Sequence, residues 1–263
     1  MSSPPVHRDA RADIAASFGE AGLAVHSVVS RAVLEKLAGL SDSGAVARYG
    51  LLESAAAVVV AFPYDPRPGS RPDPSSLSVG AFAANNRYAT MTRLLLSAGR
   101  SLAGRSGLPA KGFRAVVNSR LPEKLLGELA GLGFIGRSSL LVTRDYGPAC
   151  LLGALLFPRD YMVGEDVADD PAGSDPLAAA AGAADGGCGA CTACADACPT
   201  GAIRRGEGRR EGRAGGPGGG PGIDQERCIQ HWTTTPGEVP GPETAVDQDI
   251  EKPGRHQDEE PPL

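Results

Sequence analysis

The stretch SAAAVVVAF (Ser54–Phe62) is a continuous apolar run that ends at a proline. Such a run predicts a strand that is buried on both faces. Helical and strand patterns alternate on either side of it. We expect helices over 8–22, 31–40, 80–104 and 122–130, and strands over 24–29, 113–117, 139–143 and 150–157. The alternation predicts one α/β domain over residues 1–162.

The composition indicates a soluble globular protein and narrows the classes of function. Hydrophobic residues make up 41% of the 263 residues, and charged residues make up 22%. The net charge of −5 gives no general basic surface for nucleic acid. The apolar runs are too short to span a bilayer, and the first residues lack the features of a signal peptide. We therefore expect a cytoplasmic protein with no membrane association.

The composition changes after the α/β domain. Residues 163–187 are rich in Ala, Gly and Asp and predict a linker. Residues 188–232 hold most of the cysteines and predict a small ferredoxin-like 4Fe–4S domain, interrupted by a disordered insert at 204–222. The acidic, proline-containing stretch 233–263 predicts a disordered tail.

The cysteine run CGACTACADACP has the spacing C-x2-C-x2-C-x3-C-P of bacterial ferredoxins. Its cysteines are Cys188, Cys191, Cys194 and Cys198. Two-residue gaps allow a tight loop to wrap a small cluster, and the small residues between the ligands let backbone amides approach its sulfurs. Thiolates are also the ligands that iron–sulfur clusters select. The run predicts an iron–sulfur cluster and a function in electron transfer.

Zinc and a disulfide are the alternatives. Zinc would need two ligand pairs, Cys188 with Cys191 and Cys228 with His231, but this leaves two cysteines of the run without a role. A disulfide is disfavoured in a reducing compartment. In two-cluster ferredoxins the fourth cysteine ligates the other cluster, yet the chain has no second run of this kind. Cys228 is therefore a candidate further ligand, whereas Cys150 is expected in a buried strand.

A second motif, Gly131-Leu-Gly133-Phe-Ile-Gly136, matches the dinucleotide-binding pattern G-x-G-x-x-G. That pattern binds a pyrophosphate only where it follows a strand and opens a helix. Here a helix is expected before it and a strand after it. We therefore reject a dinucleotide site and expect a glycine turn between the helix and the strand.

Several segments together resemble the epoxyqueuosine reductase family. They are NSRLPEK (118–124), AGLGFIGRSSLLVT (130–143), LLGALLF (151–157), CGACTACADACPTGAI (188–203) and RCIQHW (227–232). The resemblance implies a cytoplasmic, cobalamin-dependent iron–sulfur oxidoreductase that reduces an epoxide in tRNA queuosine biosynthesis. It also implies cobalamin in the N-terminal domain, an electron donor of the flavodoxin or ferredoxin type, and tRNA as a partner.

The resemblance implies roles for single residues too. Cys188, Cys191 and Cys194 match ligands of the family's first cluster, and Cys198 and Cys228 match ligands of its second. Gly131, Gly133 and Gly136 are expected to form part of the cobalamin wall. The position nearest the family's catalytic Asp is Asn118, which cannot donate a proton as an acid does. Asn118 is alternatively a helix cap or a turn residue, and the whole chain is alternatively an electron-transfer protein or an inactive, truncated relative.

Overall fold

The computed structural model describes residues 10–64, 87–107, 109–159, 161, 187–204, 223–224 and 227–228. Its elements in chain order are α1 (Ala10–Glu20), β1 (His26–Ser30), α2 (Arg31–Gly39), α3 (Ser43–Tyr49), the short 3-10 turn η1 (Leu51–Glu53), β2 (Ala56–Pro63), α5 (Tyr88–Ser106), β3 (Arg114–Val117), α6 (Glu123–Leu129), β4 (Gly133–Ile135), β5 (Leu141–Thr143), β6 (Cys150–Leu156) and α9 (Ala193–Asp196). The expected alternation of helices and strands is confirmed.

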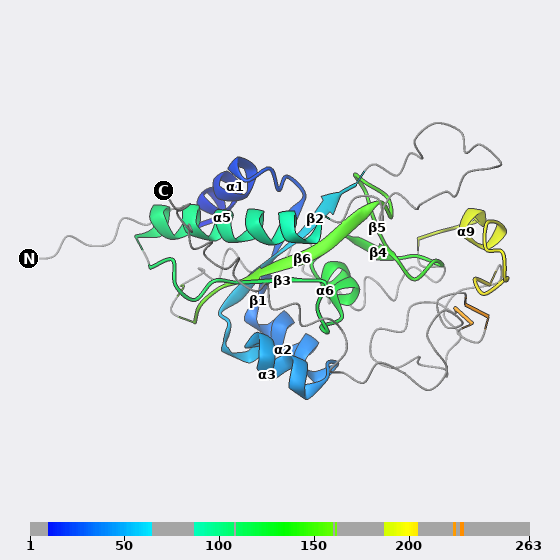
Figure 1. Cartoon of the computed structure of the whole chain (residues 1–263), viewed down its shortest axis with the longest axis horizontal. Coiled ribbons are helices and arrows are strands. Elements are labelled where there is room, and N and C mark those ends of the chain that lie inside the picture. Colours follow the sequence, from blue (N-terminus) through cyan, green and yellow to red (C-terminus); the bar gives the residue numbers. More distant parts are fainter. Residues whose placement is uncertain are drawn as a thin grey trace, which may run out of the picture.

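A four-stranded sheet with the order β1-β2-β6-β3 forms the centre of the molecule (Figure 1). Every neighbouring pair in it is antiparallel. The register places Val59 of β2 opposite Ala154 of β6, which in turn lies opposite Val116 of β3. The strand β6, late in the chain, thus separates β2 from β3 and closes the sheet through contacts distant in sequence.

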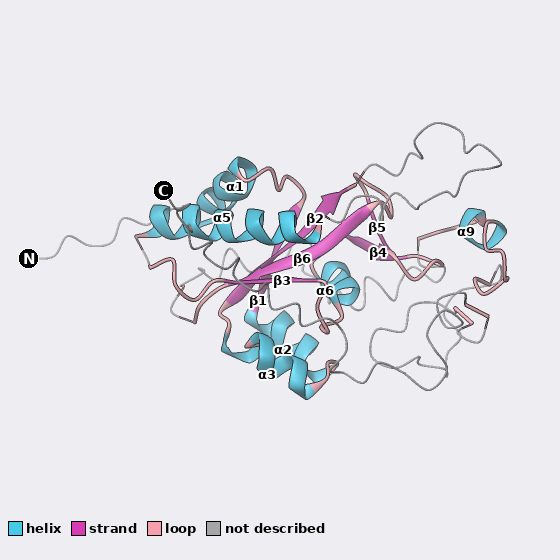
Figure 2. Cartoon of the chain, viewed as in Figure 1, coloured by secondary structure: helices cyan, strands magenta, loops and turns pink. Residues whose placement is uncertain are grey.

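Strand β2 is buried on both faces, as the apolar run predicted. Ala57, Val59 and Ala61 belong to one core, with α2, α3 and α6. The intervening residues Ala56, Val58 and Val60 belong to a second core, with α1 and α5. The side chains alternate because successive residues of a strand point to opposite faces. The domain therefore has three layers, with helices on both sides of the sheet (Figure 2).

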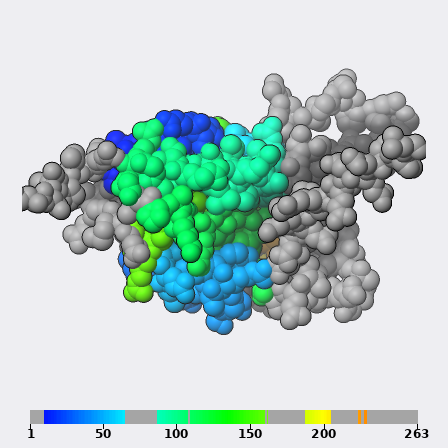
Figure 3. All heavy atoms as spheres, turned by 60° about the vertical axis from the view of Figure 1, so that its left-hand side comes forward, coloured from blue at the N-terminus to red at the C-terminus, as the bar shows by residue number. Residues whose placement is uncertain are grey.

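Helix α5 supplies much of the second core. Its buried residues Met91, Leu95, Ala98 and Leu102 follow at intervals of three or four, which places them on one face. The opposite face is in contact with solvent, and α5 and α1 together cover one side of the molecule (Figure 3). Ser101 Oγ of α5 donates a hydrogen bond to Glu20 Oε2 of α1 at 3.0 Å, and Arg105 pairs with the same carboxylate.

A second, two-stranded sheet pairs β4 with β5 as an antiparallel hairpin. The expected glycine turn is present after α6, where Gly131 has a φ of 69°, but the segment from Gly133 is a strand and not part of that turn. A Cβ at Gly133 would lie 2.1 Å from the carbonyl oxygen of Val142, so only glycine permits this pairing. Glu128 of α6 fixes the hairpin further, because its Oε1 accepts a hydrogen bond from Ile135 N at 2.9 Å.

Helix α3 was not expected; it begins after Asp42, whose Oδ1 accepts a hydrogen bond from Ala45 N at 3.0 Å. Residues 163–186, 205–222 and 229–263 lie outside the described residues, so the predicted linker, insert and tail are not tested there. Among the described residues, no helix is long and apolar enough to cross a membrane.

Candidate functional site

The cysteine run forms a compact loop that includes the short helix α9. Cys191 N donates to the carbonyl oxygen of Cys188 at 3.0 Å, which closes the first turn. Thr192 Oγ1 donates to Asp196 Oδ2 at 2.8 Å across α9, and Cys198 N donates to Ala195 O at 3.3 Å. All six cysteines of the chain are free thiols, so no disulfide competes for them.

Cys198 lies in an environment that favours its thiolate. Backbone N–H groups of Ile203, Thr200 and Ala202, together with the Thr200 hydroxyl, lower the pKa of Cys198 to about 7, with Ile203 as the largest cause. The thiolate is the form that binds a metal. At neutral pH a substantial share of this thiol is therefore already in the form that binds a metal.

Cys228 belongs to a segment that the structure pairs with the end of the cysteine run. Ile223 and Ile203 form an isolated antiparallel bridge, and Asp224 N donates to Ala202 O at 2.8 Å. Arg227 N in turn donates to Asp224 O at 3.2 Å. The chain therefore returns to the loop just before Cys228, although it is separated from Cys198 by the long insert.

The donor set suits an iron–sulfur cluster, but the thiols are not gathered around one point. Within the described ranges, no three His, Cys, Asp or Glu side chains lie close enough together to hold a metal ion. Free thiols at ferredoxin spacing are nevertheless the ligands that a cluster requires. The fit is one of chemistry and spacing, and the predicted ligand set stays a prediction.

The β4–β5 hairpin carries the cysteine loop. A Cβ at Gly136 would lie 3.4 Å from Cys188 Sγ, and a Cβ at Gly187 would lie 3.0 Å from the ring of Phe134. Arg137 N donates a hydrogen bond to Cys188 Sγ at 3.4 Å. In the glycine motif, Gly133 thus permits the close pairing of the hairpin strands, and Gly136 permits the close approach of Cys188. The expected role of the motif in a cobalamin wall stays a prediction.

Asn118 directly follows β3 and has a left-handed conformation, with φ of 52°. Asn is one of the few residues that adopt this conformation at low cost. The residue that precedes α6 is Pro122, and no side chain caps that helix. The expectation that Asn118 caps α6 is therefore wrong, and the structure agrees with a turn residue after β3.

Glu123 lies directly beside this turn and was not singled out from the sequence. Its Oε1 accepts a hydrogen bond from Ser119 N at 2.7 Å. Burial raises the pKa of Glu123 to about 7, against the lowering effect of the Ser119 hydrogen bonds. A carboxyl that is partly protonated near neutral pH can give up or accept a proton. The only sequence signal was the Pro-Glu start of the helix, which is also an ordinary first turn.

Pairwise electrostatic interactions connect this carboxyl to Tyr88, Tyr88 to Tyr64, and Tyr64 to Cys150. Burial raises the pKa of Tyr88, and the charges of Glu123 and Tyr64 raise it further. The pKa of Tyr64 is raised by burial and by Cys150. Burial also raises the pKa of Cys150, which is consistent with its expected position in a buried strand. The ends of β2, β3 and β6 thus bring several ionisable groups into one region.

Lys124 links α6 to the turn of the β4–β5 hairpin. Its Nζ donates to the carbonyl oxygen of Ser139 at 2.8 Å, and burial lowers its pKa. Ser139 has a φ of 61°, a conformation that is uncommon for a residue other than glycine. Two consecutive residues in the first turn of α6 therefore stabilise the two left-handed turns. Glu123 bonds the turn at Asn118, and Lys124 bonds the turn at Ser139.

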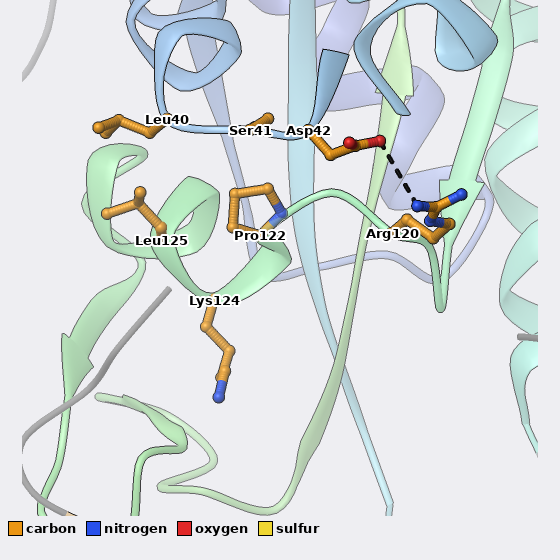
Figure 4. A pocket seen from close by; sticks show the side chains of 7 residues that line it. All are labelled: Leu40, Ser41, Asp42, Arg120, Pro122, Lys124 and Leu125. Carbon is orange, nitrogen blue, oxygen red and sulfur yellow. Dashed lines mark hydrogen bonds and ion pairs between the residues drawn. The ribbon is translucent and has the colours of Figure 1, made fainter. Parts of the chain in front are cut away.

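A pocket of about 320 Å³ lies between the α2–α3 connection and the start of α6 (Figure 4). It is lined by Leu40, Ser41, Asp42, Arg120, Pro122, Lys124 and Leu125. Arg120 is paired with Asp42 at 3.5 Å at one end, and the side chain of Lys124 extends away from the α2–α3 connection. None of the residues expected at the site lines this pocket.

No family model matches the sequence, but the sequence is similar to those of curated epoxyqueuosine reductases. An epoxyqueuosine reductase of Escherichia coli is 37% identical over 122 residues, which are 46% of this chain and 24% of that protein. One from a Synechococcus species is 34% identical over 137 residues, 51% of this chain and 37% of that protein. The chain thus matches well under half of the length of these curated relatives.

The fold also has a match among solved structures. An epoxyqueuosine reductase of Streptococcus thermophilus superposes with a TM-score of 0.51 at 19% identity. The superposition covers 84% of this chain and 56% of the other. A likeness at this identity concerns the fold, and it supports the mixed α/β architecture with an antiparallel sheet.

Proposed function

From its relationship to the epoxyqueuosine reductases, we propose that this chain is an iron–sulfur oxidoreductase of queuosine biosynthesis. The reaction is the reduction of the epoxide of epoxyqueuosine in tRNA to the alkene. Two electrons and two protons are consumed, both carbon–oxygen bonds of the epoxide are broken, and the oxygen leaves as water. The single observation that carries the proposal is the cysteine run packed on an α/β domain that matches these reductases in sequence.

The chain's own residues would hold the electron-transfer group. Cys188, Cys191 and Cys194 would ligate a 4Fe–4S cluster in a ferredoxin-like domain, and Cys198 and Cys228 match ligands of a second cluster in the family. The lowered pKa of Cys198 supports the role of this thiol as a ligand. A cluster bound at the loop would supply electrons one at a time, received from a donor of the flavodoxin or ferredoxin type.

The α/β domain would bind cobalamin and the modified nucleoside. Gly133 and Gly136 lie on the hairpin beside the cysteine loop, and Gly131 lies in the turn before it, which would place this wall close to the source of electrons. Glu123 and Tyr88 are ionisable groups of the same domain that would donate or accept protons. A simple electron carrier is not favoured, because it would not need these buried ionisable groups.

Anaerobic purification with a matched pair of variants tests the cluster. The unmodified chain should be brown, contain iron and sulfide, and bleach on reduction. Cys191→Ser should abolish the colour. Cys150→Ser is the control, because this thiol lies in β6 and not in the run. Full iron loading of the Cys191→Ser variant would overturn the ligand assignment.

The reaction is tested by incubating the loaded chain with cobalamin, a low-potential reductant and a tRNA stem loop that contains epoxyqueuosine. The expected product is queuosine, which mass spectrometry detects as the loss of one oxygen atom. Isothermal titration with cobalamin measures the binding of this cofactor separately. A chain that carries a cluster and binds cobalamin but forms no queuosine would refute the proposed substrate.

A further inference from the structure

Arg137 is the first residue after the glycine motif and makes three hydrogen bonds to the cysteine loop. Its backbone N–H donates to Cys188 Sγ at 3.4 Å. One guanidinium nitrogen donates to the carbonyl oxygen of Gly189 at 2.8 Å, and the other donates to the carbonyl oxygen of Cys191. One residue of the α/β domain therefore contacts the loop at its first ligand, just after it, and at its second ligand.

The geometry of these contacts suits arginine in particular. The guanidinium is planar, and its donors point outward in a fixed fork, so it can bond two carbonyl oxygens at once. Hydrogen bonds from a charged donor are also stronger than those between neutral groups. A lysine would keep the charge but would lack the fork. The two carbonyl contacts hold the turn between Cys188 and Cys191 in one place.

The residue that makes these contacts is itself firmly held. Arg137 follows β4, and Ile135 of that strand donates its N–H to Glu128 of α6. On the other strand of the hairpin, Leu141 packs so closely on α6 that a Cβ at Gly127 would lie 2.6 Å from its Cδ2. The guanidinium thus extends from a fixed hairpin, and it can position a loop that approaches from a distant part of the sequence.

The charge of Arg137 has no carboxylate partner among the residues that the structure describes. Its Nε is also buried and has no hydrogen-bond partner there. The Arg137 cation would stabilise the more negative, reduced state of a cluster held by Cys188 and Cys191, because hydrogen bonds and charges near the sulfurs set the reduction potential.

We propose that Arg137 is a positioning residue that holds the Cys188–Cys191 turn on the β4–β5 hairpin and raises the reduction potential of the cluster bound there. The first part concerns the chain alone. The second part rests on the proposed iron–sulfur function. The two parts are tested by separate measurements.

The first measurement uses metal-free protein and the rate at which iodoacetamide alkylates Cys188, followed by mass spectrometry. Arg137→Met should release the turn and raise this rate by roughly tenfold or more, because two charge-assisted hydrogen bonds that hold the turn are lost. Arg137→Lys should give an intermediate rate. Arg144→Met is the matched control, because Arg144 is an exposed arginine just after β5. Equal Cys188 rates in all four proteins would overturn the positioning role.

The second measurement is the midpoint potential of the loaded protein, followed by the visible absorbance. Arg137→Met should shift the potential to more negative values. Arg137→Lys should have a potential close to that of the unmodified chain, because the charge is kept. An unchanged potential in Arg137→Met would overturn the electrostatic role. Failure of the unmodified chain to bind iron would refute the proposed function and the electrostatic role, and the alkylation rates would still decide the positioning role.

Loss of iron in the Arg137→Met variant alone would also support positioning, provided that its thermal unfolding matches that of the Arg144→Met variant. If Arg137→Met does not fold, the milder Arg137→Lys variant carries the test. Its Cys188 should then react faster than that of the unmodified chain, and an equal rate would overturn the proposal.

Discussion

The carboxylate of Glu123 accepts a hydrogen bond from the backbone N–H of Ser119 at 2.7 Å. This contact ties the first turn of α6 to the left-handed turn at Asn118. The next residue, Lys124, ties the same helix to the hairpin that carries the cysteine loop. Helix α6 therefore connects the two parts of the chain that sequence patterns single out for chemistry.

The buried position of Glu123 predicts a pH-dependent contribution to stability. Its pKa is raised from 4.5 to about 7, so the folded chain binds this proton more tightly than the unfolded chain does. Stability from this group is therefore fully present below about pH 4.5 and is lost as the pH rises through about 7. The difference is on the order of 3 kcal/mol.

Urea unfolding of the unmodified chain and of Glu123→Gln, at a series of pH values, measures this effect. The variant should gain stability relative to the unmodified chain as the pH rises from 5 to 8, because glutamine cannot ionise. Glu35→Gln, which removes an exposed carboxylate from α2, is the matched control. A difference between Glu123→Gln and the unmodified chain that stays constant with pH would contradict the burial of this carboxyl.

Gly133→Ala should destabilise the protein. The added Cβ would lie 2.1 Å from the carbonyl oxygen of Val142, so the β4–β5 pairing has to open or shift. We expect a loss of at least about 2 kcal/mol in the free energy of unfolding. Gly104→Ala is the control, since this exposed glycine of α5 has open space around it and alanine favours helix by up to about 1 kcal/mol. Similar effects of both variants would argue against the close pairing of the hairpin.

Asn118→Asp should raise epoxide reduction if this position is that of the family's acid. General acid catalysis typically contributes roughly 100- to 10,000-fold, so the unmodified chain should be weakly active. Aspartate tolerates the φ of 52° about as well as asparagine does. The measurement is the rate of queuosine formation under single-turnover conditions.

Asn118→Gly is the control for this prediction. Glycine keeps the left-handed turn and supplies no acid. Activity that rises in the aspartate variant alone would support the acid role. Equal activity in all three proteins would identify Asn118 as a turn residue only, and robust reduction by the unmodified chain would refute the loss of acid chemistry.

The iron content of this chain should not exceed one cluster. Two 4Fe–4S clusters require about eight ligands, whereas the chain has six cysteines, and one of these, Cys150, lies in β6. We therefore expect about four irons and four sulfides per chain. Colorimetric iron and sulfide analysis, with the oligomeric state measured by analytical ultracentrifugation, provides the check. A monomer with roughly eight irons would contradict this limit.

Local patterns predicted the principal elements well. The apolar run became the central strand β2, and the expected strand over 150–157 became β6. Helix α3 was missed because it is short and depends on its cap at Asp42. Strand β4 was missed because its glycines indicate a turn when they are considered alone. The pairing of β4 with β5 depends on the register that places Val142 opposite Phe134, and the residues of β4 alone do not indicate that register.

The sequence by itself determined the alternation of elements and the cysteine run, because burial patterns and ligand spacing are properties of neighbouring residues. Only the tertiary structure decided that β6 lies between β2 and β3, because backbone hydrogen bonds between distant strands carry no residue-specific signal. It also decided the contact of Arg137 with Cys188. The two residues are 51 positions apart, and they meet because α6 fixes the hairpin that presents the backbone N–H of Arg137 to the Cys188 thiol.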